Sequence, residues 1–180
     1  MTPTQARTIE AALDLFARHG IGGTSLQMIA DQVGVTKAAI YHQFRSKEQI
    51  VTAAAEAELW RVVEVIDRAE AMSSSELARD TLIEGMVDLA VARRRKMGTV
   101  LGDPMVAEIF AGNQTFRVVM NRLRRLLFPG DAVADARIRT AVLVAAISGP
   151  VMQPFLLDLD DDLLRPHIRR LARLYLSSED

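Results

Sequence analysis

The spacing of hydrophobic residues predicts helices along nearly the whole chain, and three short ones come first. Residues 4–19 are the first helix, which ends at Gly20. Residues 24–33 are the second, which ends at Gly34, and residues 36–44 are the third. Their inward positions recur at the spacing of an amphipathic helix: Ile9, Ala12, Leu13 and Phe16, then Leu26, Ile29, Ala30 and Val33, then Ile40 and Phe44.

Hydroxyl residues stand where the later helices begin. Thr24 is followed three positions on by Gln27, the spacing of a capping box, so Thr24 is predicted to be the N-cap of the second helix. Thr36 is predicted to cap the third. Ser46 and Gln49 repeat the capping-box spacing and begin a fourth, much longer helix, which reaches about residue 72 without a glycine or proline. A rigid helix of this length is predicted to link two bodies and to transmit movement between them.

Two short helices joined by a turn that contains glycine are typical of a helix-turn-helix, whose second helix fits the major groove of DNA. With Ile40 and Phe44 inward, the outward face of the third helix offers a cation, hydroxyls, an imidazole and a methyl group, all suited to phosphates and base edges. These outward residues are Thr36, Lys37, Ala38, Tyr41 and His42. An ordinary corner between two helices, with a solvated face, is the alternative that this geometry leaves open.

Four linked motifs, LFARHG, TSLQMIA, VGVTKAAIYHQF and RSKEQI, occur in this order between Thr8 and Ala54. This stretch resembles the DNA-binding domain of the TetR (tetracycline repressor) family of transcriptional regulators. The resemblance implies that residues 36–39 lie nearest the bases. Ala38 departs from the family, which often has glycine there, and its methyl group is suited to a thymine methyl. The resemblance also implies that Tyr41, His42 and Lys47 bind phosphates. The candidate DNA-binding residues are therefore Thr24, Ser25, Thr36, Lys37, Ala38, Ala39, Tyr41, His42 and Lys47.

The rest of the chain continues the helical pattern. Further helices are predicted over residues 76–97, 104–111, 113–128, 135–157 and 163–176. The fourth of these is kinked or broken by Gly149-Pro150 and Pro154. No strand-like alternation occurs, so we predict an all-α protein. It comprises a three-helix helix-turn-helix DNA-binding domain over residues 1–47 and a helical-bundle domain for effector binding and dimerisation over residues 48–180.

Charged clusters in the second part are predicted to be structural. The run from Arg93 to Lys96 is predicted to complement the dipole of a helix that Gly98 closes and to face solvent, with anion binding as the alternative. Asp160, Asp161 and Asp162 are predicted to open the last helix and not to bind a metal. In that helix the residues predicted to face one way are Leu164, Ile168, Leu171 and Tyr175.

Composition narrows the class of protein. The chain has 180 residues, 49% of them hydrophobic, which is ample for a core. The net charge of −1 argues against a protein that coats nucleic acid non-specifically. The lack of cysteine excludes disulfides and thiolate metal sites. With no apolar signal region and no run long enough to span a membrane, we expect a cytoplasmic protein that does not bind membranes.

These features favour a homodimeric repressor that binds a palindromic operator on double-stranded DNA and is released by a small, mainly apolar effector. The last two helices of each subunit are the candidates for the dimer interface. The alternatives are a constitutive DNA-binding protein without a working pocket and an enzyme with an appended DNA-binding domain. No catalytic residue, metal or cofactor is expected, because histidines are scattered and no paired carboxylates stand beside a base. The candidate pocket residues are Trp60, Met86, Phe110, Phe116, Met120, Met152 and Phe155.

Overall fold

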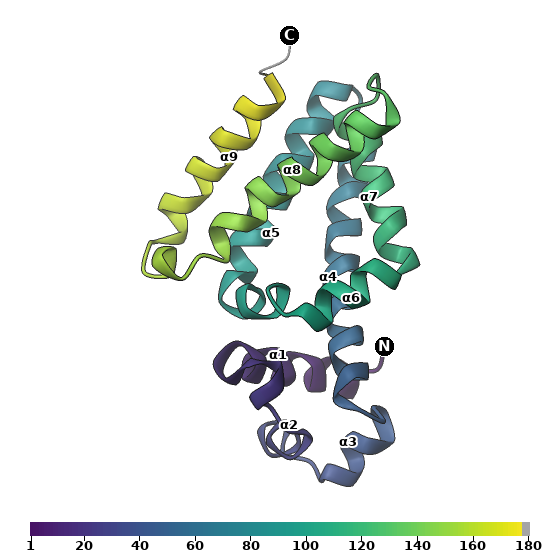
Figure 1. Cartoon of the computed structure of the whole chain (residues 1–180), viewed down its shortest axis with the longest axis vertical. Coiled ribbons are helices and arrows are strands. Elements are labelled where there is room, and N and C mark those ends of the chain that lie inside the picture. The colour runs from purple at the N-terminus through teal and green to yellow at the C-terminus, as the bar shows by residue number, and fades with distance from the viewer. Residues whose placement is uncertain (178–180) are drawn as a thin grey trace. The chain divides into compact units, whose positions relative to one another are not determined.

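The computed structural model describes residues 1–177, apart from the side chains of Met97 and Thr99, and within this range it contains helices and no strand (Figure 1). The all-α prediction is confirmed. The helices are α1 (Pro3–Gly23), α2 (Leu26–Val33), α3 (Lys37–Gln43), α4 (Lys47–Glu70), α5 (Ser75–Leu101), α6 (Pro104–Gly112), α7 (Gln114–Leu127), α8 (Val133–Val151), the 3-10 helix η1 (Pro154–Leu156) and α9 (Asp161–Ser177). None of these helices is long and apolar enough to cross a membrane.

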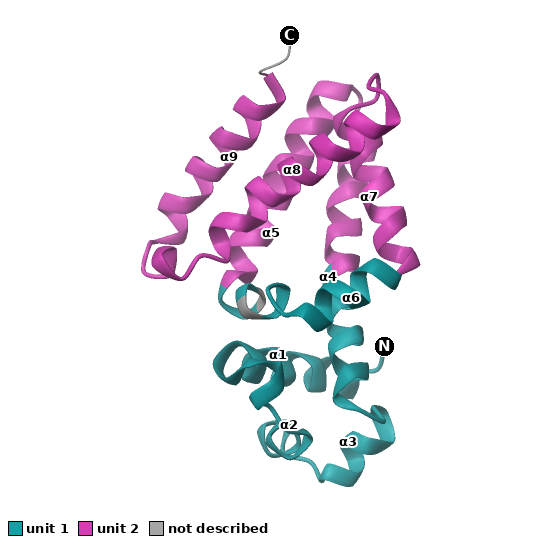
Figure 2. Cartoon of the chain, viewed as in Figure 1, with its two compact units in different colours: residues 1–58, 95–112 teal, residues 59–94, 113–180 magenta. Residues whose placement is uncertain are grey.

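The chain divides into two compact units (Figure 2). Unit 1 contains residues 1–58 and 95–112, and unit 2 contains residues 59–94 and 113–180, of which the last three lie outside the described residues. The boundaries fall inside α4 and α5, so each of these long helices contributes to both units.

Unit 1 is built on the three short helices that the sequence predicts. Its core contains the predicted inward residues Ile9, Leu13, Phe16, Ile29 and Ile40, all buried. Residues from the end of α5 and from α6, namely Val100 and Val106, are buried in the same cluster. The helices that carry the candidate DNA-binding residues thus share a core with residues of α5 and α6, which come much later in the chain.

Unit 2 is a helical bundle in which α8 packs against both α7 and α9. Its core draws apolar side chains from every α-helix of the unit, among them Ile66, Leu82, Val87, Leu143 and Ile168. Pro150 lies inside the last turn of α8, which ends at Val151, and Pro154 then opens η1 (Figure 1). The predicted break in this region is confirmed.

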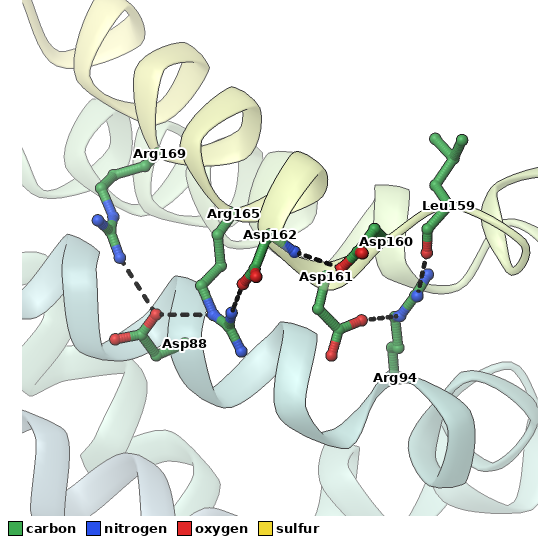
Figure 3. Close-up of polar contacts among 8 residues, drawn as sticks. All are labelled: Asp88, Arg94, Leu159, Asp160, Asp161, Asp162, Arg165 and Arg169. Atoms are coloured by element: carbon green, nitrogen blue, oxygen red, sulfur yellow. Dashed lines mark hydrogen bonds and ion pairs between the residues drawn. The ribbon is translucent and has the colours of Figure 1, made fainter.

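Acidic residues on α5 and arginines on α9 form a ladder of ion pairs within unit 2. The pairs and their N–O distances are Asp88–Arg165 at 3.2 Å, Asp88–Arg169 at 3.1 Å, Glu84–Arg173 at 3.2 Å and Asp80–Arg173 at 3.1 Å. Figure 3 shows Asp88 reaching toward two successive arginines of α9. Because both sets of residues are spaced by four, the ladder holds α9 along α5 over more than two turns.

The prediction that the run from Arg93 to Lys96 faces solvent is wrong for Arg94. Only 3% of Arg94 is exposed, and its guanidinium donates hydrogen bonds to the carbonyl oxygens of Leu156 and Leu159. Figure 3 shows the bond to Leu159. The helix also does not end at Gly98, because α5 continues until Val100 reaches the core of unit 1. The run therefore lies inside a helix and takes part in packing.

Two features of α9 bear on the sequence predictions, namely its first residues and its buried side. The three acids do open α9: Asp160 accepts a hydrogen bond from the Asp162 N–H at 3.0 Å, and Asp161 Oδ1 lies 2.8 Å from Arg94 Nε. Leu171, however, is 60% exposed, so the prediction that it faces the same way as Leu164 and Ile168, which are buried, is wrong. Ala172 is buried in its place, because the side of α9 that faces the bundle follows Leu164, Ile168 and Ala172.

Candidate nucleic-acid interface

A short turn sets the third helix against the second. Gly34 ends α2 with φ at +77°, a left-handed conformation that favours glycine, and its N–H donates to the Ala30 carbonyl at 2.9 Å. Two residues later Thr36 caps α3, as predicted, by accepting a hydrogen bond from the Ala39 N–H at 3.2 Å. A connection of three residues between two packed helices gives the geometry of a helix-turn-helix.

The N-cap of α2 is Ser25, so the capping box predicted at Thr24 is wrong by one residue. The Ser25 hydroxyl accepts from the Met28 N–H at 3.2 Å. Thr24 is only 2% exposed, and its hydroxyl donates to the Gly20 carbonyl at 2.8 Å. Gly20 has φ at +72° and interrupts α1 near its end, which is what turns its carbonyl toward Thr24. The partner expected for Thr24, Gln27, instead donates to Asp31.

Polar side chains of α1 tie the motif together. Arg7 donates to the carbonyl of Val33 at 3.1 Å, at the end of α2, where unsatisfied carbonyls are expected. Arg18 donates to the Gln32 side chain of α2 at 2.7 Å. These contacts, together with the buried apolar face, fix α2 and leave α3 with one face free.

That free face carries most of the candidate residues. Thr36, Lys37, Ala38, Tyr41 and His42 are exposed, while Ile40 beneath them is fully buried. Lys37 and Tyr41 stand one turn apart, and the ammonium lies 5.8 Å from the centroid of the Tyr41 ring, which is within the range of a cation–π contact. A helix of this size, with a cation and hydroxyl groups on its open face, has the chemistry to contact phosphates and base edges.

The remaining candidates are Ala39, Ser25 and Lys47. Ala39 is partly buried and Ser25 is exposed. The Lys47 ammonium donates to the carbonyl oxygens of Ile21 at 2.6 Å and Thr24 at 3.1 Å. In this structure Lys47 therefore anchors the connection between α1 and α2, a role that the residue pattern did not reveal.

The start of α4 is also polar. The Ser46 hydroxyl accepts from the Gln49 N–H at 3.3 Å, as predicted, but the Gln49 side chain accepts from the Arg45 N–H in place of that of Ser46. A hydrogen bond from Ser46, together with the backbone N–H at the helix start, lowers the pKa of the Glu48 carboxyl. The exposed Arg45, between α3 and α4, was not among the candidates, although a cation directly after α3 is the signal that would have added it.

The seven candidate pocket residues are not gathered around one cavity. Trp60 is 62% exposed and Phe155 is 73% exposed, and Phe110 packs against the core of unit 1. Met86 and Met152 pack against the core of unit 2. Phe116 and Met120 line an open cleft of about 450 Å³, formed by α7 and α8 within unit 2 and called the α7–α8 cleft below. Inside the bundle, a cavity beside Met86 has a volume of about 10 Å³, which is too small for an organic ligand.

Comparison with known sequences finds similarity over the segment that contains the helix-turn-helix. Residues 9–54 match the family described as "Bacterial regulatory proteins, tetR family". Over 47 residues the chain is 45% identical to a probable acrEF/envCD operon repressor of Escherichia coli, a stretch that is 26% of this chain and 21% of the relative. The chain therefore spans about a fifth of the length of the curated relatives that it matches first.

Comparison with solved structures extends the likeness to the whole fold. The fatty acid degradation regulator FadR from Bacillus halodurans superposes with a TM-score of 0.82 at 19% identity, over 99% of this chain and 97% of the other. The transcriptional regulator FadR from Bacillus subtilis, in complex with stearoyl-CoA, gives a TM-score of 0.79 at 17% identity, over 97% and 99%. At such low identity the likeness shows a shared fold.

Proposed function

Because this chain belongs to the TetR family of bacterial regulatory proteins, we propose that it is a DNA-binding transcriptional regulator and, more specifically, a homodimeric repressor. Residues 1–47 bind a palindromic operator, and residues 48–180 dimerise and bind an effector. The observation that carries the proposal is the exposed face of α3, which presents Lys37, Tyr41 and His42 over a fully buried Ile40. The protein acts by binding, in the cytoplasm, and not as an enzyme.

In this proposal the exposed candidate residues contact DNA, and those with hydrogen bonds inside unit 1 support the interface. Residues 36–39 contact base edges, and Tyr41, His42 and the added Arg45 contact phosphates. Ser25 is exposed at the start of α2, where a helix N-terminus suits a phosphate. Thr24 and Lys47 are engaged in hydrogen bonds within unit 1, so they support the interface chiefly by fixing the position of α2.

The dimer interface in this proposal is formed by α8 and α9. Apolar side chains remain exposed on both helices, although the opposite faces are buried in unit 2. They are Ile138 and Val142 on α8 and Leu163, Leu171 and Leu174 on α9. Two copies of such a pair of helices bury these side chains in a four-helix arrangement with twofold symmetry. Two recognition helices are then available for two half-sites, which one short helix alone does not read selectively.

The effector is proposed to be a small molecule with a large apolar part, which weakens DNA binding. A protein of the same fold, FadR from Bacillus subtilis, has a structure in complex with stearoyl-CoA, and this supports the proposal that this chain also binds a ligand. In this chain the α7–α8 cleft is large enough for such a ligand, whereas the small cavity beside Met86 is not. Since α4 and α5 contribute to both units, they are the elements proposed to transmit the effect.

Selection from a pool of random DNA duplexes by the full chain tests this function. We expect enrichment of an inverted repeat whose half-sites lie about one helical turn, or somewhat more, apart, and a dimer in sedimentation. Lys37→Glu, on the exposed face of α3, should abolish enrichment. Arg125→Glu makes the same change of charge on α7 and should not. A stable monomer at micromolar concentration, or a selection without any enriched sequence, contradicts the proposal.

A further inference from the structure

We propose that the α7–α8 cleft binds an amphiphile that joins an apolar chain to one anionic group, a carboxylate or a phosphate. The proposal rests on the proposed function, because this ligand is then the effector of the regulator. The cleft has a volume of about 450 Å³, within the range of sites for small molecules. Its walls come from α7 and α8, which pack side by side in unit 2 (Figure 1).

The apolar residues that line the cleft suit a hydrocarbon chain. Phe116 and Met120 stand one turn apart on α7, and Val133 and Ala141 contribute apolar surface from α8. An aromatic ring, a flexible thioether and two aliphatic groups bind a tail through burial of apolar surface, without demanding one fixed shape. An inorganic anion would leave this surface unused.

Arginines alternate with these apolar residues along the lining of the same cleft. Arg117 and Arg124 are seven residues apart and so lie on one face of α7, and Arg137 approaches from α8. No acidic residue lines the cleft in the part of the chain that the structure describes. Arg117 and Arg137 are exposed, so their positive charges attract an anionic ligand to the cleft and repel a cationic one.

These arginines also differ from their neighbours on the same helices. Arg122 on α7 pairs with Asp67 at 2.6 Å, and Arg139 on α8 pairs with Asp131 at 2.6 Å. By contrast, Arg117, Arg124 and Arg137 form no ion pair with any carboxylate of residues 1–177.

The Nε of Arg124 is buried and has no hydrogen-bond acceptor. A buried donor without an acceptor is unfavourable, and a carboxylate or phosphate matches the planar fork of a guanidinium. The apolar wall and the unpaired arginines together therefore select for a ligand that has both a tail and an anionic head.

Calorimetric titration of the full chain with four ligands that share one tail tests the proposal. Dodecanoate and dodecyl phosphate carry the two anionic heads, dodecanol is neutral and dodecylammonium is cationic, each kept below its micelle-forming concentration. We expect at least one anionic ligand to bind about tenfold or more tightly than dodecanol, with dodecylammonium weakest. The tighter of the two anions assigns the head as carboxylate or phosphate.

Matched variants locate the site. Arg124→Gln and Arg137→Gln should each raise the Kd of the anionic ligand about tenfold, whereas Arg125→Gln, on an exposed side chain outside the cleft, should change it less than about twofold. If Arg124→Gln does not fold, the proposal is tested by the Kd of Arg137→Gln and by the relative affinities of the four ligands for the unchanged protein.

The proposal is overturned if neither anion binds, if dodecanol binds as tightly as the anions, or if Arg125→Gln weakens binding as much as the variants in the cleft. The titration contains no DNA. Its failure therefore leaves the result of the DNA selection standing, and a failed selection leaves the titration standing.

Discussion

The Nε atom of Arg94 on α5 lies 2.8 Å from the Oδ1 atom of Asp161 at the start of α9. The same guanidinium donates at 2.9 Å to the carbonyl of Leu156, in the segment that connects α8 to α9. A single side chain, almost completely buried, thus fixes the beginning of the last helix. Because α8 and α9 are the proposed dimer interface, this contact sets the position of a surface on which the proposed function depends.

Replacing Arg94 should therefore be costly. Arg94→Ala leaves two carbonyls without their donor and Asp161 without its cation, and we expect the free energy of unfolding to fall by about 3 kcal/mol. The matched control is Arg95→Ala, because Arg95 is the next residue of α5 and is exposed. It should change stability by less than about 0.5 kcal/mol. Urea unfolding at one protein concentration measures both, and equal losses would contradict the role given to Arg94.

Gly85 marks a close approach between α5 and α4 in unit 2. A Cβ atom added there would lie 2.6 Å from Val65 Cγ1, which is too close for real atoms. Although alanine favours a helix by about 1 kcal/mol over glycine, we expect Gly85→Ala to destabilise the protein by about 1–3 kcal/mol.

Two further variants test the cause of that loss. Gly112→Ala is the control, since nothing lies within 4 Å of its added Cβ. Combining Gly85→Ala with Val65→Ala should cost less than the sum of the single changes, because both act on one contact. Strict additivity in thermal unfolding would show that the clash is not the cause.

The pair of carboxylates around Arg122 predicts a dependence of stability on pH. Arg122 Nη2 lies 2.6 Å from oxygens of both Asp67 and Glu70, and this hydrogen bond holds the pKa of the Glu70 carboxyl below its ordinary value of 4.5. A carboxyl whose pKa is lower in the folded state stabilises that state above the unfolded pKa and loses the effect as pH falls through the folded pKa.

The variant Arg122→Gln tests whether this stabilisation by Glu70 is lost as pH falls. At about pH 7 it should cost about 0.5–1 kcal/mol, the usual value for partly exposed pairs, and the difference from the unchanged protein should shrink as pH falls below about 4. Chemical unfolding of both proteins across this range measures it. If the difference in the free energy of unfolding between the two proteins grows on acidification, the ion pair between Arg122 and Glu70 is not its cause.

Replacing Lys47 tests whether its side chain mainly stabilises the fold of unit 1 or mainly contacts DNA. If its ammonium mainly bridges the carbonyls of Ile21 and Thr24, Lys47→Met should lower the free energy of unfolding by about 2 kcal/mol in the absence of DNA. If it mainly binds phosphate, stability without DNA should stay unchanged and only the salt dependence of binding should become shallower. Lys37→Met is the control, because Lys37 is exposed and should have little effect on unfolding.

The helices could be predicted from sequence because their signals are local. The spacing of apolar residues locates α1 to α3, and the cap at Thr36 is recognisable as a polar residue before an apolar run. The cap of α2 was misplaced because Thr24 and Ser25 both have a suitable hydroxyl. In the structure the Thr24 hydroxyl donates to the Gly20 carbonyl, and the Ser25 hydroxyl caps α2.

Contacts between distant residues could not be predicted in the same way. Gly98 is an ordinary stop signal for a helix, yet α5 passes through it because Val100 finds a place in the core of unit 1. The basic run before it was interpreted from its neighbours alone, although Arg94 binds residues more than 60 positions later. The candidate DNA contacts on α3 stay a prediction, because they depend on a partner and not on packing.

The central claim is that α3 reads bases, and the base preference of Lys37→Ala tests it most directly. Affinities of this variant and the unchanged protein are measured on a panel of single-base variants of the selected operator, with Tyr41→Phe, which loses a hydroxyl and no charge, as control. We predict that Lys37→Ala costs about 1–3 kcal/mol per half-site and removes the preference at one base position, while Tyr41→Phe weakens all sequences alike. An unchanged base preference in Lys37→Ala, with a changed one in Tyr41→Phe, would contradict the orientation of α3 in the groove.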